Sequence, residues 1–216
     1  MGIFDKLFGK KQPENKVQTS FSVEELTENE MQLCKNAKIS EEDGLLLKKL
    51  TKHPIELLKF EQEFSEIKKP VAISSLTSEE NAKKIVLDNL DYFKKQGKYI
   101  FMYGLGDGGY IVGLIGATSD PYKIMEYAET NGVNHDVETI NIIEKCKKWD
   151  KEFGIIPIGI GFDYCEFKIK NTNIDFNKLA KEIYDFCPDV VDQGTETIDA
   201  LEAEIKRTGS IYLWWD

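Results

Sequence analysis

The segment Ile211-Tyr-Leu-Trp-Trp-Asp216 ends this chain of 216 residues. It is apolar almost throughout, which is typical of a β-strand that lies inside a sheet. Chain ends commonly fray and tolerate change, but a last strand with two tryptophans is expected to contribute to the core. Successive side chains of a strand point to opposite faces, so one tryptophan should enter the core and the other should lie on the second face. We therefore predict that the fold needs these residues.

The elements before this strand occur in a repeated order. A helix over 197–207 ends at Gly209. Four elements follow one another upstream of it: a helix from 137 to 153, strands over 155–160 and 164–169, and a helix capped by Asp175. An earlier strand over 71–76 precedes a first copy of the same order, with a helix from Thr77, strands over 99–105 and 110–117, and a helix with Pro121 at its first position.

A shift of 55 residues places Asp120 on Asp175 and Gly104 on Gly159. The shared order, turn glycines and helix caps indicate internal duplication. We predict an α+β fold in which two related α-β-β-α (ferredoxin-like) half-units share a mostly antiparallel sheet, with an N-terminal helical extension.

The chain divides into three parts: an N-terminal peptide and linker over 1–20, a helical extension over 21–69, and an α+β domain over 70–216. In the extension, Ser22 with Glu25 reads as a capping box, Ser40 begins a second helix, and Pro54 either breaks that helix or begins a third over 55–60.

Residues 1–11, Met1-Gly-Ile-Phe-Asp-Lys-Leu-Phe-Gly-Lys-Lys11, differ from the rest of the chain. Ile3, Phe4, Leu7 and Phe8 have helical spacing, and three lysines against one aspartate give the peptide a charge of +2. The pattern leaves three alternatives open: weak contact with an anionic membrane surface, docking on the protein's own body, or disorder. The linker after it is polar, so removing residues 1–20 should affect folding little.

The net charge of −10 argues against nucleic acid as a partner, because neutralising phosphates requires clustered Lys and Arg. It suits a cytosolic protein that its charge keeps soluble, or a partner of a basic protein. The four cysteines contain no C-x-x-C pair and no signal peptide is recognised, so we expect reduced thiols in a cytoplasm. No apolar run has the length of a membrane span.

Three motifs are candidates for chemistry. The segment Gly104-Leu-Gly-Asp-Gly-Gly109 matches G-x-G-x-x-G, but a strand follows it, so it predicts a hairpin turn and no cofactor. Cys187 lies at a helix C-terminus, where the helix dipole disfavours a thiolate, so it reads as a buried structural thiol. The two histidines and four cysteines lack zinc-ligand spacing, and no metal is predicted.

The candidate site is the turn from Cys187 to Gly194 together with the end of the chain. We expect Asp192 to bond to loop backbone, and Gln193 and Trp215 to face a groove. The aspartates of this region alternatively hold a hard cation. The predicted binding residues are Asp189, Asp192, Gln193, Trp214, Trp215 and Asp216.

Several blocks of the second half resemble the family known as domain of unknown function 4253: Asp120-Pro-Tyr, 130–136, Trp149-Asp150, 161–163, 182–194, 207–209 and Leu213-Trp-Trp-Asp216. The resemblance covers 120–216 and implies a compact α+β domain in a bacterial cytoplasm, with no assigned reaction. His135 stands where the family pattern has an aromatic residue, so we expect no histidine-dependent chemistry there.

These features predict an acidic, non-catalytic protein-binding module, of immunity or antidote type, with a basic partner. The alternative is a carboxylate-based, metal-dependent hydrolase that uses the turn from Asp189 to Gln193. No catalytic residue is assigned, and the sequence sets neither the partner nor the oligomeric state.

Overall fold

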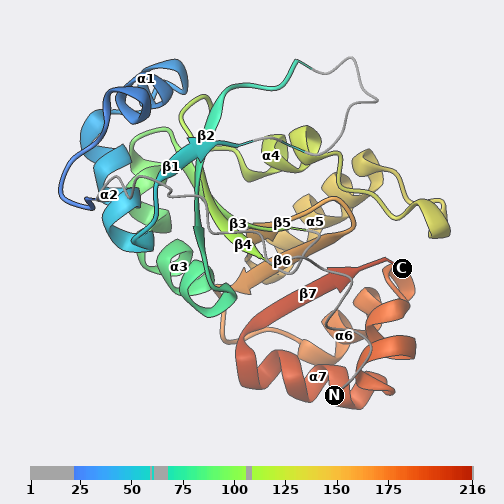
Figure 1. Ribbon diagram of the computed structural model, residues 1–216. Helices are drawn as coiled ribbons and strands as arrows, with labels where there is room; N and C mark the ends of the chain where they lie inside the picture. The colour runs from blue at the N-terminus through green and yellow to red at the C-terminus, as the bar shows by residue number, and fades with distance from the viewer. Residues whose placement is uncertain (1–21, 59, 61–67, 106–108, 216) are drawn as a thin grey trace, which may run out of the picture.

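The computed structural model describes residues 22–58, 60, 68–105 and 109–215. Within them, seven strands form one sheet in the order β1-β2-β4-β3-β5-β6-β7 (Figure 1). All neighbouring strands are antiparallel except β3 and β5, which are parallel and meet at Met102 and Gly159. The strands are β1 Ile55–Leu57, β2 Ala72–Thr77, β3 Tyr99–Gly104, β4 Tyr110–Ile115, β5 Ile155–Ile160, β6 Tyr164–Ile169 and β7 Ser210–Trp214.

The predicted α+β class, mostly antiparallel sheet and N-terminal helices are confirmed. The two predicted units correspond to α3 (Glu79–Lys95), β3, β4 and α4 (Pro121–Ala128), and to α5 (Thr139–Phe153), β5, β6 and α6 (Phe176–Phe186). The carboxylates of Asp120 and Asp175 cap α4 and α6 in the same way, by accepting from backbone N–H groups.

The units differ in how each completes its part of the sheet. β2 pairs with β4 and precedes its hairpin along the chain, whereas β7 pairs with β6 and follows its hairpin. With β1 left aside, the sheet order is therefore symmetric about the β3–β5 pair, but the chain order is not. The finer ferredoxin-like description of the units is not confirmed.

Helices cover both faces of the sheet. Phe60 lies between Phe101 of β3 and Tyr127 of α4, with 6.4 Å between ring centroids in both pairs. The next residue along β3, Met102, lies on the opposite face near Glu166, which bonds to Lys83 of α3. Since successive strand residues alternate between faces, α3 and α4 lie on opposite sides of the sheet. α5 packs against α4, and the Tyr122 hydroxyl of α4 donates a hydrogen bond to the Cys146 carbonyl of α5.

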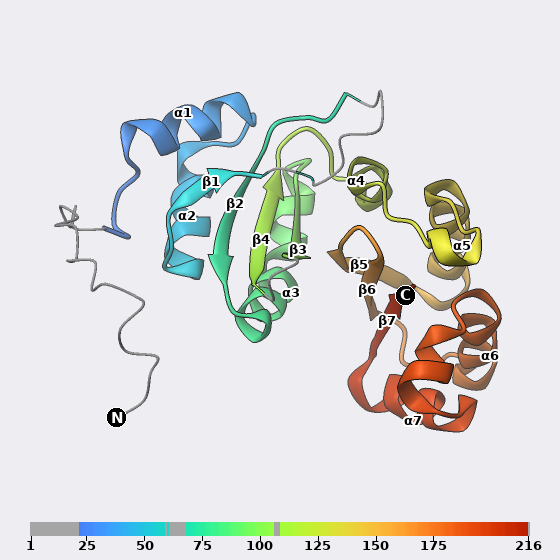
Figure 2. The same ribbon diagram turned by 45° about the vertical axis from the view of Figure 1, so that its right-hand side comes forward.

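The ends of the sheet carry separate helix pairs. Figure 2 shows α1 (Glu28–Asn36) and α2 (Glu41–Thr51) beside β1 and β2, and α6 and α7 (Ile198–Thr208) beside β7. α1 begins one residue after Thr27, whose side chain forms a capping box with Glu30, so the box predicted from Ser22 to Glu25 is wrong. The third helix considered for 55–60 is also wrong, because Ile55–Leu57 pairs with β2 as a strand.

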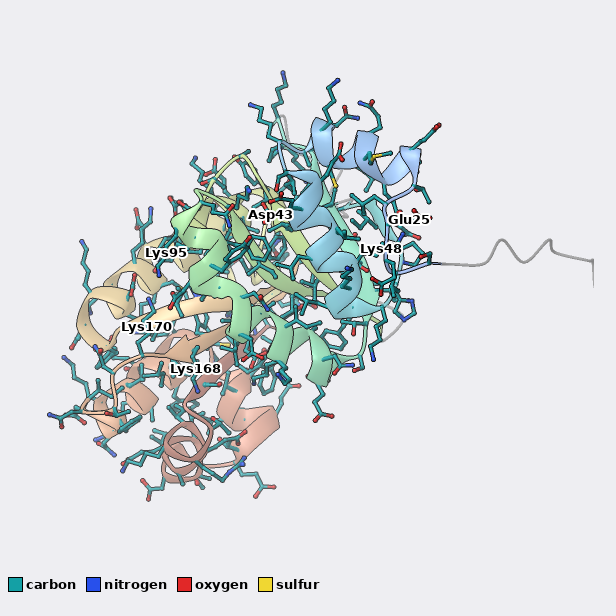
Figure 3. The ribbon with its side chains drawn as sticks, turned by 90° about the vertical axis from the view of Figure 1, so that its left-hand side faces the viewer. Glu25, Asp43, Lys48, Lys95, Lys168 and Lys170 are labelled. Atoms are coloured by element: carbon teal, nitrogen blue, oxygen red, sulfur yellow. The ribbon has the colours of Figure 1, made fainter. Side chains whose placement is uncertain are left out.

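A buried ion pair joins α1 to α2. The Nζ of Lys48 lies 2.7 Å from Oε2 of Glu30 and 2.9 Å from the Glu25 carbonyl oxygen, and Figure 3 shows Lys48 on α2 beside Glu25. The other carboxylate oxygen of Glu30 accepts from the N–H of Ile55, 2.9 Å away. Glu30 thus fixes α1, α2 and β1 together. The predicted N-terminal peptide and linker, residues 106–108 of the predicted turn, and Asp216 lie outside the described residues.

Candidate functional site

The two terminal tryptophans have different environments, as the alternation of a strand predicts. Leu213 and Trp215 are buried, with Trp215 only 4% exposed, and Trp214 is half-buried. The prediction that Trp215 faces a groove is wrong, because its ring packs against the backbone of Gly132 and edge-on against Phe186, with ring centroids 5.9 Å apart. Within the described residues, its indole N–H has no hydrogen-bond partner.

Trp214 borders a pocket of about 420 Å³ between α7, β7 and the π-helical turn Val190–Thr195. Its ring tip also lies against Gly194. The predicted turn after Cys187 is therefore a short π-helix, and the tryptophan beside its groove is Trp214. Gln193 is exposed, but it does not line this pocket.

The aspartates of the turn do not converge. The Asp192 carboxylate accepts from the Tyr184 hydroxyl at 3.2 Å, so the predicted bond to loop backbone is replaced by a side-chain contact. The buried Asp189 carboxylate lies 2.9 Å from Nε2 of His135. Among the described residues, no three His, Cys, Asp or Glu side chains are arranged to hold a metal ion.

His135 is the site residue that the sequence argument missed. It lies on the 3₁₀ turn Val133–His135, far along the chain from Asp189, so no local spacing predicts the pair. The available signal was the position of His135 inside the 130–136 block, which is one of the blocks that carry the family resemblance. The pair ties the turn before α5 to the turn before α7.

Residues 130–137 form a braced loop. Gly132 and Val137 exchange two backbone hydrogen bonds, of 2.8 and 3.1 Å, which close the loop on itself. Its base is held by the N–H of Asn131, which donates to the Phe162 carbonyl at 2.8 Å, and by the Thr130 hydroxyl, which donates to the Gly161 carbonyl at 2.6 Å. Trp215 supports the loop from below at Gly132. The family-like blocks thus meet around this loop.

The loop forms one wall of a pocket of about 810 Å³ between the end of α4 and the start of α5. Val133 is 71% exposed and Ile140 is 52% exposed, the two highest values among the exposed large hydrophobic side chains of the described residues. The lining is apolar and acidic, without Lys, Arg or His: Glu126, Glu129, Asn131, Val133, Asp136, Val137, Glu138, Thr139, Ile140 and Ile143.

Two of the four acids in the lining are paired with lysines outside it. Lys123 lies 2.6 Å from Glu126, and Lys69 lies 2.8 Å from Glu129. Within the described part of the chain, Asp136 and Glu138 take part in no ion pair, and both are exposed. The pocket therefore combines apolar side chains with four carboxylates, which we call its rim: Glu126, Glu129, Asp136 and Glu138.

The four cysteines are buried, as was expected for Cys187. Burial raises the pKa of the Cys187 thiol to about 12 and that of Cys34 to about 11. It raises the pKa values of Cys146 and Cys165 further. A thiol acts as a nucleophile in its thiolate form, so these environments suit packing better than reaction.

The fold and this site define an α+β domain with a loop-bordered, acidic and apolar surface pocket. Residues 112–216 match the family described as Domain of unknown function (DUF4253), which confirms the resemblance of the C-terminal half. No curated protein and no solved structure matches the chain significantly. None of the described helices is both long and apolar enough to cross a membrane.

Proposed function

We propose that the protein is a non-catalytic binding module whose site is the pocket between α4 and α5. The observation that carries this proposal is the exposed apolar pair Val133 and Ile140 inside a rim of carboxylates. Exposed apolar surface rimmed by polar groups is typical of protein interaction sites. A braced loop also suits binding, because a preformed surface loses little conformational entropy when a partner docks.

The chemistry of the pocket selects a basic partner segment with apolar side chains. Apolar groups would cover Val133 and Ile140, while Lys or Arg would face Asp136 and Glu138. Complementary charge speeds encounter and suppresses wrong partners more than it adds affinity. With a net charge of −10, the whole chain attracts such a partner over a longer range.

An immunity- or antidote-type role, in which the protein covers a basic partner in a bacterial cytoplasm, is part of this proposal. The alternative of a carboxylate-based hydrolase has less support, since Asp189 and Asp192 contact His135 and Tyr184 instead of sharing a site.

Calorimetric titration of the full chain with a synthetic amphipathic helix of Leu and Lys tests the proposal. The double substitution Glu126→Lys and Glu138→Lys reverses two of the four rim charges and so cancels the net negative charge of the rim. We expect it to weaken binding at least about tenfold, or ~1.4 kcal/mol. The matched control, Glu80→Lys with Asp91→Lys, changes the net charge equally at exposed positions of α3 and should retain the affinity at the pocket.

A Leu and Glu peptide of the same length should not bind. Equal loss of binding in the rim variant and the α3 control would show that only net charge matters, and would overturn the assignment of the pocket.

A further inference from the structure

We propose that residues 1–11 of a neighbouring copy of this chain dock in the pocket between α4 and α5. The segment then competes with the basic partner for the same pocket. This inference rests on the proposed function of the pocket. It is carried by the match between the pocket and a segment that lies outside the described residues.

The segment has the chemistry that the pocket selects. Ile3, Phe4, Leu7 and Phe8 recur at helical spacing, so a helix over these residues would carry them on one face. Lys6, Lys10 and Lys11 give the segment a charge of +2, although the whole chain is acidic. The apolar side chains would meet Val133 and Ile140, and the lysines would meet the carboxylate rim. Recognition of an amphipathic helix by an apolar groove follows this pattern.

Charge separates this segment from the other long segment outside the described residues. Residues 61–67 are Glu-Gln-Glu-Phe-Ser-Glu-Ile, which also offers apolar side chains. Their three glutamates would meet Glu126, Asp136 and Glu138 and be repelled. Among these segments, residues 1–11 are the complementary occupant.

The linker favours a neighbouring copy as the acceptor. The ten residues 12–21 span at most about 34 Å when fully extended. A folded chain of this size has a radius of gyration of about 17 Å, and hence a diameter of roughly 44 Å. Figure 2 shows α1, near which the described chain begins, and α5 at opposite sides of the molecule. Docking between copies needs no such reach, and it joins two different surfaces head to tail.

A spin label on the intact chain tests the docking. Gln12→Cys places a thiol beside the segment without changing its charge, and the native thiols are buried. Chain of natural isotope content that carries the spin label is mixed with ¹⁵N-enriched chain that has no spin label. Broadening of the amide signals then reports contact between copies alone. We expect the amides of 133–140 to lose intensity, and those around Tyr92 on α3 to keep theirs.

Two variants provide controls. Phe4→Ser with Phe8→Ser removes both aromatic side chains from the apolar face of the segment, and Glu126→Lys with Glu138→Lys cancels the net charge of the rim. Each should restore the lost intensity. Absence of broadening at 133–140 in the mixed sample would overturn the proposal, as would broadening spread evenly over the surface. Broadening seen only when label and isotope share one chain would contradict docking between copies.

Vesicles separate the membrane alternative from this one. If the segment partitions onto vesicles of phosphatidylglycerol and phosphatidylcholine while the mixed sample shows no broadening, then the segment is a membrane contact and the inference fails. The proposed function fails by a different result, because it requires only that the Leu and Lys peptide recognise the rim.

Discussion

At the scale of single residues, one contact connects the end of the chain to the candidate site. Trp215 is covered by Gly132, and Gly132 closes the loop that presents Val133 to the pocket. A Cβ at position 132 would lie 2.6 Å from Cγ of Trp215, closer than real Cβ contacts. The backbone there has φ −125°, which any residue adopts, so the need for glycine is purely steric.

Gly132→Ala should therefore destabilise the fold, because the tryptophan or the loop must move. We expect a loss of about 1–3 kcal/mol in the free energy of unfolding, the usual cost of overpacking, measured by urea denaturation. Asn134→Ala, at an exposed position of the same loop, is the control and should change stability little. An unchanged midpoint for Gly132→Ala would show that Trp215 does not support the loop.

The His135–Asp189 pair makes a second prediction at this scale. His135→Ala and Asp189→Ala should be non-additive, with a coupling of about 0.5–3 kcal/mol in a double-mutant cycle of unfolding. The same cycle on Tyr184 and Asp192, whose 3.2 Å contact is exposed, should give a smaller coupling. Additive effects for His135 and Asp189 would mean that their contact does not fix the loop.

At the scale of elements, β7 is an edge strand that nonetheless belongs to the core. Leu213 and Trp215 are buried, and the carbonyl of Trp214 accepts from the Cys187 thiol at 2.9 Å. This strand therefore holds the π-helical turn as well as the sheet.

Deletion of Leu213 to Asp216 should unfold the domain. Loss of a buried large aromatic side chain costs about 3–5 kcal/mol, which is a large part of the total stability of a domain. Circular dichroism and thermal melting would detect the loss. A truncated chain that melts at the temperature of the intact chain would contradict this prediction.

The ion pairs of the N-terminal helices should make the free energy of unfolding depend on pH. Burial opposes ionisation of Glu30, but the hydrogen bonds from Lys48, Thr27 and the N–H of Ile55 together outweigh it and hold the pKa of Glu30 below its ordinary value of 4.5. Burial likewise opposes ionisation of Asp43, but Lys98 together with the hydroxyls of Ser40 and Tyr92 lowers its pKa from the ordinary value of 3.8. Because the folded-state pKa values are depressed, this stabilisation is complete above about pH 4.5 and is lost as the pH falls below these values.

Urea denaturation between pH 6 and pH 3 checks this. The intact chain should lose stability towards pH 3, and Glu30→Gln should be less stable at pH 6 but lose less on acidification. Parallel curves for the two proteins would show that Glu30 does not contribute to the acid response.

At the scale of the whole molecule, the N-terminal peptide and the folded body are predicted to be separable. Removal of Met1 to Ser20 should change the free energy of unfolding little, because a polar linker joins the peptide to the body. The same truncation should reduce association between copies, as measured by sedimentation at increasing concentration. A large loss of stability in dilute truncated protein would show that the peptide belongs to the core of its own chain.

The sequence alone determined most of the elements and many of their limits. Helix caps such as Asp120, Asp175 and Thr197, and the apolar runs of β5 and β6, act through neighbours in the chain, so their signals are local. Two predictions were wrong, the capping box at Ser22 and the helix over 55–60. Thr27 caps α1 instead of Ser22, and pairing with β2 makes Ile55–Leu57 a strand.

Only the tertiary structure decided how these elements meet. The parallel joining of β3 to β5, the contact of His135 with Asp189, and the packing of Trp215 on Gly132 connect residues far apart in the chain. Such contacts depend on the path of the whole chain, and no spacing within a segment encodes them. For this reason the sequence indicated that the terminal tryptophans matter, but the fold had to show that Trp215 supports the loop beside the pocket.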